Sequence, residues 1–443
     1  MNTKRFARLV AGTTLMALLG AACAQGGGET EVSVAPQSQA GHASAPEVQA
    51  QADPGNPVDL LRVAAGHLPG LAATLAGSFS QQFPDKYPGS VEDGAAKLRQ
   101  TLTAGLQEHE YLAGIAVAMA VVTKSPTSPE FEAAAAALDK NSVALSEAVT
   151  SVYGPEAGTR FLDLWRTHIG FFVDYTVGKL TNDAAKADAA RAGLDSYRAD
   201  FGAFIESAGA PGLTKEAVAE ALVPHVDSTF AAIDAVVAGD GTGIEKLRVA
   251  AGHMPMLAAT LAGSIAQQFP DKYTGDPNSG ASTLMATLTA GLQEHEYLAG
   301  ITVVMGVLTK SITSPEFEAA AAALDKNSVA LSEAVTSVYN ADAGARFLDL
   351  WRTHIGFFVD YTLGKLTNDA AKAQAARAGL DSYRADFGAF VESAGAPGLT
   401  KDAVAQALIP HVDSTFAAID SVVAVLGAPA AAPQAQESLP RTS

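Results

Sequence analysis

Apolar residues recur along most of this chain at spacings of three and four positions, and strand-like alternation is scarce. Around His168, for example, Leu164, Trp165, Phe171 and Phe172 lie within one turn on either side, so they share one helical face with it. Alanine, the strongest helix former, is abundant. The pattern therefore predicts an all-α protein.

Proline and capping residues set the expected helix boundaries. Pro84 ends the first apolar stretch, Ser128 and Pro129 form an N-cap with a first-turn proline, and Thr214 opens another helix. The first half of the chain is expected to form six helices, at about 57–82, 91–124, 129–153, 155–181, 183–208 and 214–238.

The chain contains an internal repeat. The stretch 61–238 returns at 247–424 with a constant offset of 186 residues, as His295 minus His109 shows, and without insertion or deletion. We therefore expect two tandem copies of a roughly six-helix bundle domain, at 57–238 and 244–426, joined by a glycine-rich hinge at 239–243. Short connections predict antiparallel neighbouring helices within each bundle.

The first 23 residues are typical of an export signal, with three basic residues followed by an apolar run that is too short for a transmembrane helix. Cys23, the only cysteine, ends a segment that resembles a bacterial lipobox, which predicts a lipid-anchored protein of the cell envelope. Ordinary cleavage after Ala24 is the alternative. Residues 24–56 and 427–443 are rich in small and polar residues, so they are expected to be a flexible tether and a disordered tail.

The charge balance narrows the choice of partners. The formal net charge is −18, and loss of Lys4, Arg5 and Arg8 with the signal would make it −21. Such an acidic protein is not expected to bind nucleic acid. It is expected to associate with an anionic membrane only through a lipid anchor.

Histidine is the residue type that suggests chemistry. One of nine, His42, lies in the tether, and the others form two matching sets: His67, His109, His168 and His225, then His253, His295, His354 and His411. All of them are expected near the middle of their helices, and most on apolar faces, where side chains of a bundle can meet at half its height. This predicts a shared metal centre in each copy, with His67 and His109 as the leading pair. The alternative is that these are core histidines with satisfied ring nitrogens.

Missing motifs restrict the kind of centre. The helices lack the Glu-x-x-His spacing of di-iron bundles and the His-Glu-x-x-His of zincin proteases, and the chain has no Cys-x-x-Cys-His for haem attachment. Imidazole ligands without cysteine favour copper, ahead of zinc or iron. Glu108, Glu110, Asp163 and Asp227 could orient the rings, although most of these carboxylates are expected to be solvated.

Three longer motifs carry a resemblance: Leu-Gln-Glu-His-Glu-Tyr-Leu (106–112), Leu-Asp-Lys-Asn-Ser (138–142) and Phe-Leu-Asp-Leu-Trp-Arg-Thr-His-Ile-Gly-Phe-Phe (161–172). They resemble a group of exported helical bacterial envelope proteins that includes a surface-layer-associated copper-only superoxide dismutase. The resemblance implies a helical copper site with redox activity on superoxide. It also makes cell-envelope or surface-layer proteins candidate partners. Ligands can be carried over only to the eight paired histidines named above.

Three functions therefore remain open from the sequence. The first is a copper enzyme that removes superoxide, the second a copper or zinc scavenging protein, and the third a structural envelope module without metal. Superoxide is an anion, so the acidic chain would need local cations such as Arg166, Lys140 or Arg198 to attract it.

Overall fold

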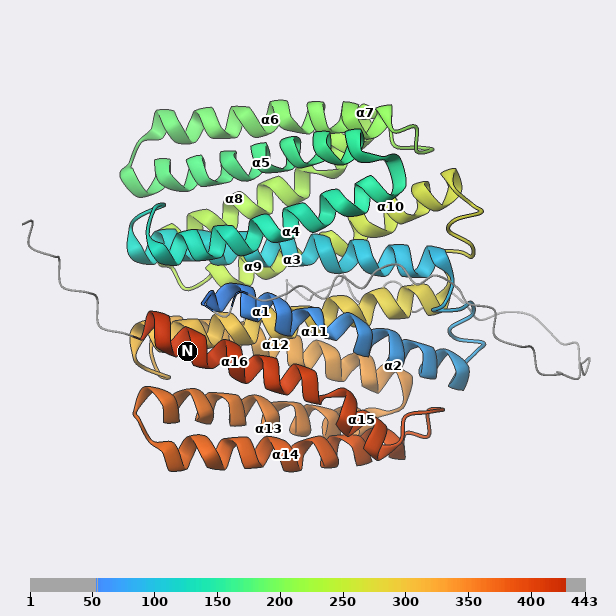
Figure 1. Cartoon of the computed structure of the whole chain (residues 1–443), viewed down its shortest axis with the longest axis vertical. Helices are drawn as coiled ribbons and strands as arrows, with labels where there is room; N and C mark the ends of the chain where they lie inside the picture. The colour runs from blue at the N-terminus through green and yellow to red at the C-terminus, as the bar shows by residue number, and fades with distance from the viewer. Residues whose placement is uncertain (1–52, 54, 428–443) are drawn as a thin grey trace, which may run out of the picture. The chain divides into compact units, whose positions relative to one another are not determined.

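The computed structural model describes residue 53 and residues 55–427. The predicted signal, Cys23, almost all of the tether, and residues 428–443 of the tail lie outside these residues. The described chain consists of helices and short connections without strands, which confirms the all-α prediction (Figure 1).

Each copy forms eight helices. Those of the first copy are α1 (Pro57–Gly66), α2 (Leu68–Gln82), α3 (Gly94–Thr123), α4 (Pro129–Tyr153), α5 (Pro155–Thr181), α6 (Ala184–Ser207), α7 (Lys215–Ala221) and α8 (Val223–Ala238). Those of the second copy are α9 (Gly243–Ala251), α10 (Met254–Gln268), α11 (Gly280–Thr309), α12 (Pro315–Val338), α13 (Ala341–Leu366), α14 (Ala370–Ser393), α15 (Lys401–Ala407) and α16 (Ile409–Leu426).

The six helices expected in each copy are present, but the first and the sixth are each broken in two. The breaks lie at His67 and Leu222, and a proline, Pro69 or Pro224, occupies the first turn of the helix that follows. Proline has no backbone N–H and its ring collides with the carbonyl one turn earlier, so the preceding helix ends there. The second copy is broken at the equivalent places.

The helices that pack together are drawn from both copies. α9 and α10 of the second copy pack against α8 and α3 of the first, while α1 and α2 of the first pack against α16 and α11 of the second (Figure 1). The connection from α8 to α9 spans only 239–242, so α9 folds back onto α8. The packing units are therefore offset from the sequence repeats by one pair of helices.

The long helices α3 and α11 lie against each other at the centre of this arrangement. The rings of Tyr111 and Tyr297 stack there with centroids 5.3 Å apart. Glycine allows other helices to come close: a Cβ atom on Gly114 would lie 2.4 Å from the side chain of Leu247, and one on Gly300 equally close to Leu61. Each of these leucines belongs to the other copy, so the contact that requires glycine is a contact between copies.

Buried charges lie where α1 meets the central helices. Arg62 donates to Asp59 at 3.1 Å and to Glu108 at 3.5 Å, and Asn141 donates to Glu108 at 3.2 Å. The two carboxylates are almost completely buried, and burial raises the pKa of Glu108 against the opposing charge of Arg62. Arg62 is therefore the counter-ion that keeps this carboxylate inside the protein.

Within residues 55–427, three segments are long and apolar enough to cross a membrane, judged by length and composition: Lys215–Ala238, Gly243–Gln268 and Lys401–Leu426. Each is interrupted by a helix break. The described chain is thus compatible with association with a membrane.

Candidate metal centres

The structure gathers the histidines into two clusters. Six of the eight are buried, with 2–8% of their surface exposed: His109, His168, His225, His295, His354 and His411. His67 and His253 are more exposed and sit at the helix breaks before α2 and α10. The buried residues come from the middle of α3, α5, α11 and α13 and from the first turn of α8 and α16.

In the first cluster two imidazoles meet edge to edge. Nε2 of His109 on α3 lies 3.2 Å from Nε2 of His168 on α5. Trp165 fixes both rings, with centroids 4.8 Å from His109 and 4.6 Å from His168, and Tyr197 stacks on His168 at 5.0 Å. The aromatic residues that share a face with His168 in the sequence therefore position the ring by packing.

A third histidine reaches the cluster from α8 beside a buried carboxylate. Nδ1 of His225 lies 3.4 Å from Oε2 of Glu110, and the hydroxyl of Thr229 donates to Oε1 of Glu110 at 3.1 Å. Nδ1 of His225 has no hydrogen-bond partner among the described residues. The carboxylate and the unpartnered nitrogen thus face each other in the interior.

The second cluster repeats this geometry. His354 and His295 approach at 3.2 Å between Nε2 atoms, and His411 lies 3.5 Å from Glu296. Ligand atoms of His295, Glu296 and His411 all lie within 4.8 Å of one another. Both clusters therefore have the same paired contacts, but among the described residues three ligand atoms come this close together only in the second cluster.

Of the four carboxylates that the sequence offers for orienting the rings, Glu108 and Glu110 are buried, and so is Glu296, the counterpart of Glu110 in the second copy. Only 1% of Glu110 is exposed, because α3 is covered on several sides and residues 106–112 are all buried. Neighbouring residues of a helix point in different directions, so burial of both His109 and Glu110 requires partners around the helix. The spacing of apolar residues along α3 gives no indication that Glu110 is buried. Asp163 and Asp227 are exposed, as expected.

His67 does not join His109, the partner that the sequence favoured, but belongs with the second cluster. It follows α1, which packs against α16, and precedes α2, which packs against α11. Burial, and then the proximity of His67, lower the pKa of His411 to about 4. His253 relates to His225 of the first cluster in the same way. Each cluster is therefore flanked by an outer histidine from the other copy.

Burial controls the protonation of the clusters. It lowers the pKa of His109 and of His354 to about 3, and raises the pKa of Glu110 and of Glu296 to about 8. Near neutral pH the imidazoles are uncharged, so their nitrogen lone pairs are free to bind a cation.

These shifts predict how the stability of the metal-free protein depends on pH. Burial lowers the pKa values of His109 and His354 to about 3 and of His225 and His411 to about 4, and it also lowers those of His168 and His295, from about 6.5 in the unfolded chain. Below pH 6.5 the unfolded chain therefore binds more protons than the folded protein, so the free energy of unfolding falls as pH drops. The two glutamates bind protons more tightly when folded, so their contribution is lost as pH rises from about 4.5 to about 8. Six histidines outweigh two glutamates in the range where both act. Urea unfolding midpoints should therefore peak near pH 6.5 and fall more steeply on the acid side.

Glu110→Gln with Glu296→Gln is the control for this prediction, because glutamine does not titrate. The variant should lose the decline between pH 6.5 and 8 and keep the acid-side loss. A midpoint in the parent protein that rises steadily up to pH 8 would contradict the expected effect of the glutamates.

No family model, no curated protein and no solved structure matches this chain.

Proposed function

We propose that this protein binds two transition-metal ions, one in each cluster, and that the ion is copper. The distance between imidazole nitrogens carries this proposal. Two ligands held tetrahedrally at about 2.0–2.1 Å from one ion lie roughly 3.3–3.4 Å apart. The Nε2 atoms of His109 and His168 are 3.2 Å apart, and His225 and Glu110 approach at 3.4 Å. Each pair therefore has the spacing of two ligands around one ion, and in the second cluster ligand atoms of His295, Glu296 and His411 lie within 4.8 Å of one another.

The donor set fits a copper(II) ion. Three neutral imidazoles and one carboxylate suit copper, zinc, nickel and iron, and copper(II) has the highest affinity among the divalent first-row metals. A bound dication would displace the proton of Glu110, leaving a net charge of +1 in a buried site. The carboxylate thus offsets part of the charge that burial would otherwise make costly.

Dismutation of superoxide, which the resemblance implies, receives less support from the site than metal binding does. The histidines are almost fully buried. The cations that could attract an anion are paired: Arg166 with Asp139, Lys140 with Asp59, and Arg198 with Asp195. We keep superoxide dismutation as the redox reaction to be tested on the copper-loaded protein, after free copper has been removed.

One observation favours a purely structural role as the second candidate. A separation of 3.2 Å between Nε2 atoms is also the geometry of a hydrogen bond between two neutral imidazoles, one donating and the other accepting. Such a bond would satisfy these nitrogens without a metal.

Metal titration separates the two candidates. Protein expressed without an affinity tag is stripped with a chelator, loaded with copper(II) or zinc(II), passed through a desalting column and analysed for bound metal. We expect two equivalents of copper per chain, with retention of copper over zinc when both are offered. If less than half an equivalent of metal per copy is retained, the proposal of metal binding is wrong and the structural role is favoured.

A further inference from the structure

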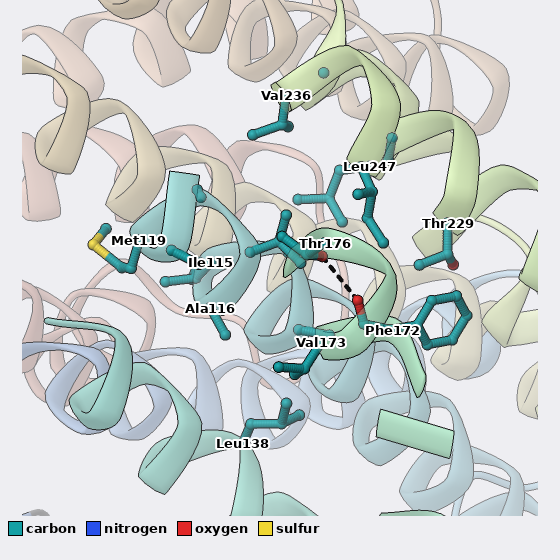
Figure 2. A pocket seen from close by; sticks show the side chains of 18 of the residues that line it. Ile115, Ala116, Met119, Leu138, Phe172, Val173, Thr176, Thr229, Val236 and Leu247 are labelled. Atoms are coloured by element: carbon teal, nitrogen blue, oxygen red, sulfur yellow. Dashed lines mark hydrogen bonds between the residues drawn. The ribbon is translucent and has the colours of Figure 1, made fainter. Parts of the chain in front are cut away.

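Each cluster adjoins an apolar pocket. The first pocket, of about 70 Å³, is lined by His109 and Glu110 and by apolar residues such as Ile115, Phe172 and Val236 (Figure 2). The second, of about 50 Å³, is lined by His295 and Glu296 among others. Ile115, Met119 and Val304 line both pockets. At these three residues the two pockets are therefore separated only by apolar side chains. Both copies contribute to each pocket.

The threonine hydroxyl groups in the pocket walls already donate hydrogen bonds within the protein. Thr176 donates to the carbonyl of Phe172 at 2.8 Å, the bond drawn in Figure 2, and Thr229 donates to Glu110 and to the carbonyl of His225. Thr362 makes the same bond to Phe358 in the second pocket. A buried water needs two to four polar partners, and these walls offer few beyond the cluster itself. The pockets are therefore suited to an apolar occupant.

We propose that the two pockets bind small neutral apolar molecules of the size of dioxygen and lead them to the histidine clusters. An engineered cavity of about 150 Å³ takes up benzene or xenon. These pockets are about half that size or less, so a diatomic gas or a xenon atom fits better than a ring. An anion would lose its hydration in such surroundings without gaining a partner, so ions are excluded. The proposal does not require that a metal be bound.

Methionine methyl groups provide the test. Met119 lines both pockets and Met305 lines only the first, whereas Met285 is equally buried in another cluster of the core and Met256 is exposed. NMR spectra of metal-free protein with ¹³C-labelled methionine methyl groups are recorded under xenon and under an inert gas of low affinity. Xenon should shift the signals of Met119 and Met305 and leave those of Met285 and Met256 in place. Dissolved dioxygen, which is paramagnetic, should broaden the same two signals.

Two matched substitutions assign the effect to the pockets. Ala232 lines the first pocket and Ala418, its counterpart in the repeat, lines the second. Methionine adapts to irregular space, so Ala232→Met should fill the first pocket and abolish the xenon shift of Met305. Ala418→Met should leave that shift unchanged. Circular dichroism checks that each variant folds, and the measurement on the parent protein stands without them.

The outcomes are distinct from those of metal titration. Shifts confined to Met119 and Met305 support the pockets even if no metal binds. The absence of xenon shifts, or equal shifts at Met285, would overturn the proposal even for a protein that holds two copper ions. Iodide is the probe for ions, and a specific iodide shift at Met305 would overturn the exclusion of anions.

Discussion

Replacement of both His109 and His295 by alanine is expected to abolish tight copper binding, from two equivalents per chain to none. Each of these rings is central to its cluster, because it lies 3.2 Å from a second histidine and next in sequence to the buried glutamate. Alanine removes one ligand and also the aromatic contact with Trp165 or Trp351 that orders the site. Each single variant should keep one equivalent, because the clusters lie in different halves of the structure. Bound metal measured after desalting checks the series.

The control for this series uses the outer histidines. In the His295→Ala background only the first cluster remains, and its outer histidine is His253 of the second copy. Adding His253→Ala should weaken copper retention, whereas adding His67→Ala should not, because His67 flanks the cluster that has already been removed. If His67→Ala has the larger effect, the crossed assignment of the outer histidines is incorrect.

Replacement of Arg62 by methionine is expected to lower the free energy of unfolding by about 3–5 kcal/mol, the usual cost of removing one partner from a buried ion pair. Arg62 is the nearby cation of Glu108 and contacts Asp59 as well, and Asp59 is completely buried. Without the guanidinium group, Glu108 must either keep an uncompensated charge or become protonated. Urea unfolding at neutral pH measures the loss.

An exposed ion pair supplies the matched control. Arg166 donates two hydrogen bonds to Asp139, but each side chain is nearly half exposed. Arg166→Met should therefore cost less than about 1 kcal/mol. Adding Glu108→Gln to Arg62→Met should recover part of the stability by removing the buried charge. Equal losses for Arg62→Met and Arg166→Met would show that the buried pair contributes no more than a surface pair.

Local sequence predicted most of the helices because their causes are local. Ser128 caps α4 through a hydrogen bond to the amide of Phe131, and Pro155 lies at the start of α5, as their positions in the sequence suggested. The two missed breaks also have a local cause. Pro69 and Pro224 lie at these breaks, but spacing alone does not separate a proline bend inside a helix from the start of a new helix.

The candidate site was only partly predictable. The face shared by His168, Trp165 and Phe172 follows from periodicity, and these residues are buried together. The role of Glu110 depends on the cover that α3 receives from other helices, and the helix itself gives no signal of it. The sequence gives even less indication of where His67 lies, because the helices on either side of it, α1 and α2, pack against α16 and α11, far along the chain.

Local patterns in the sequence are enough to predict a helical chain with two equivalent copies, in which histidine is the distinctive polar residue. The folded arrangement adds which histidines meet, the glutamate that joins each set, and the packing of α1 and α2 with the opposite copy. Helix formation depends on neighbours three and four residues away, whereas these contacts join residues that are far apart along the chain. Near-identical copies present near-identical surfaces, so the sequence leaves open which copy a helix packs against. The short connection between α8 and α9, and the close contacts at Gly114 and Gly300, favour the exchanged arrangement.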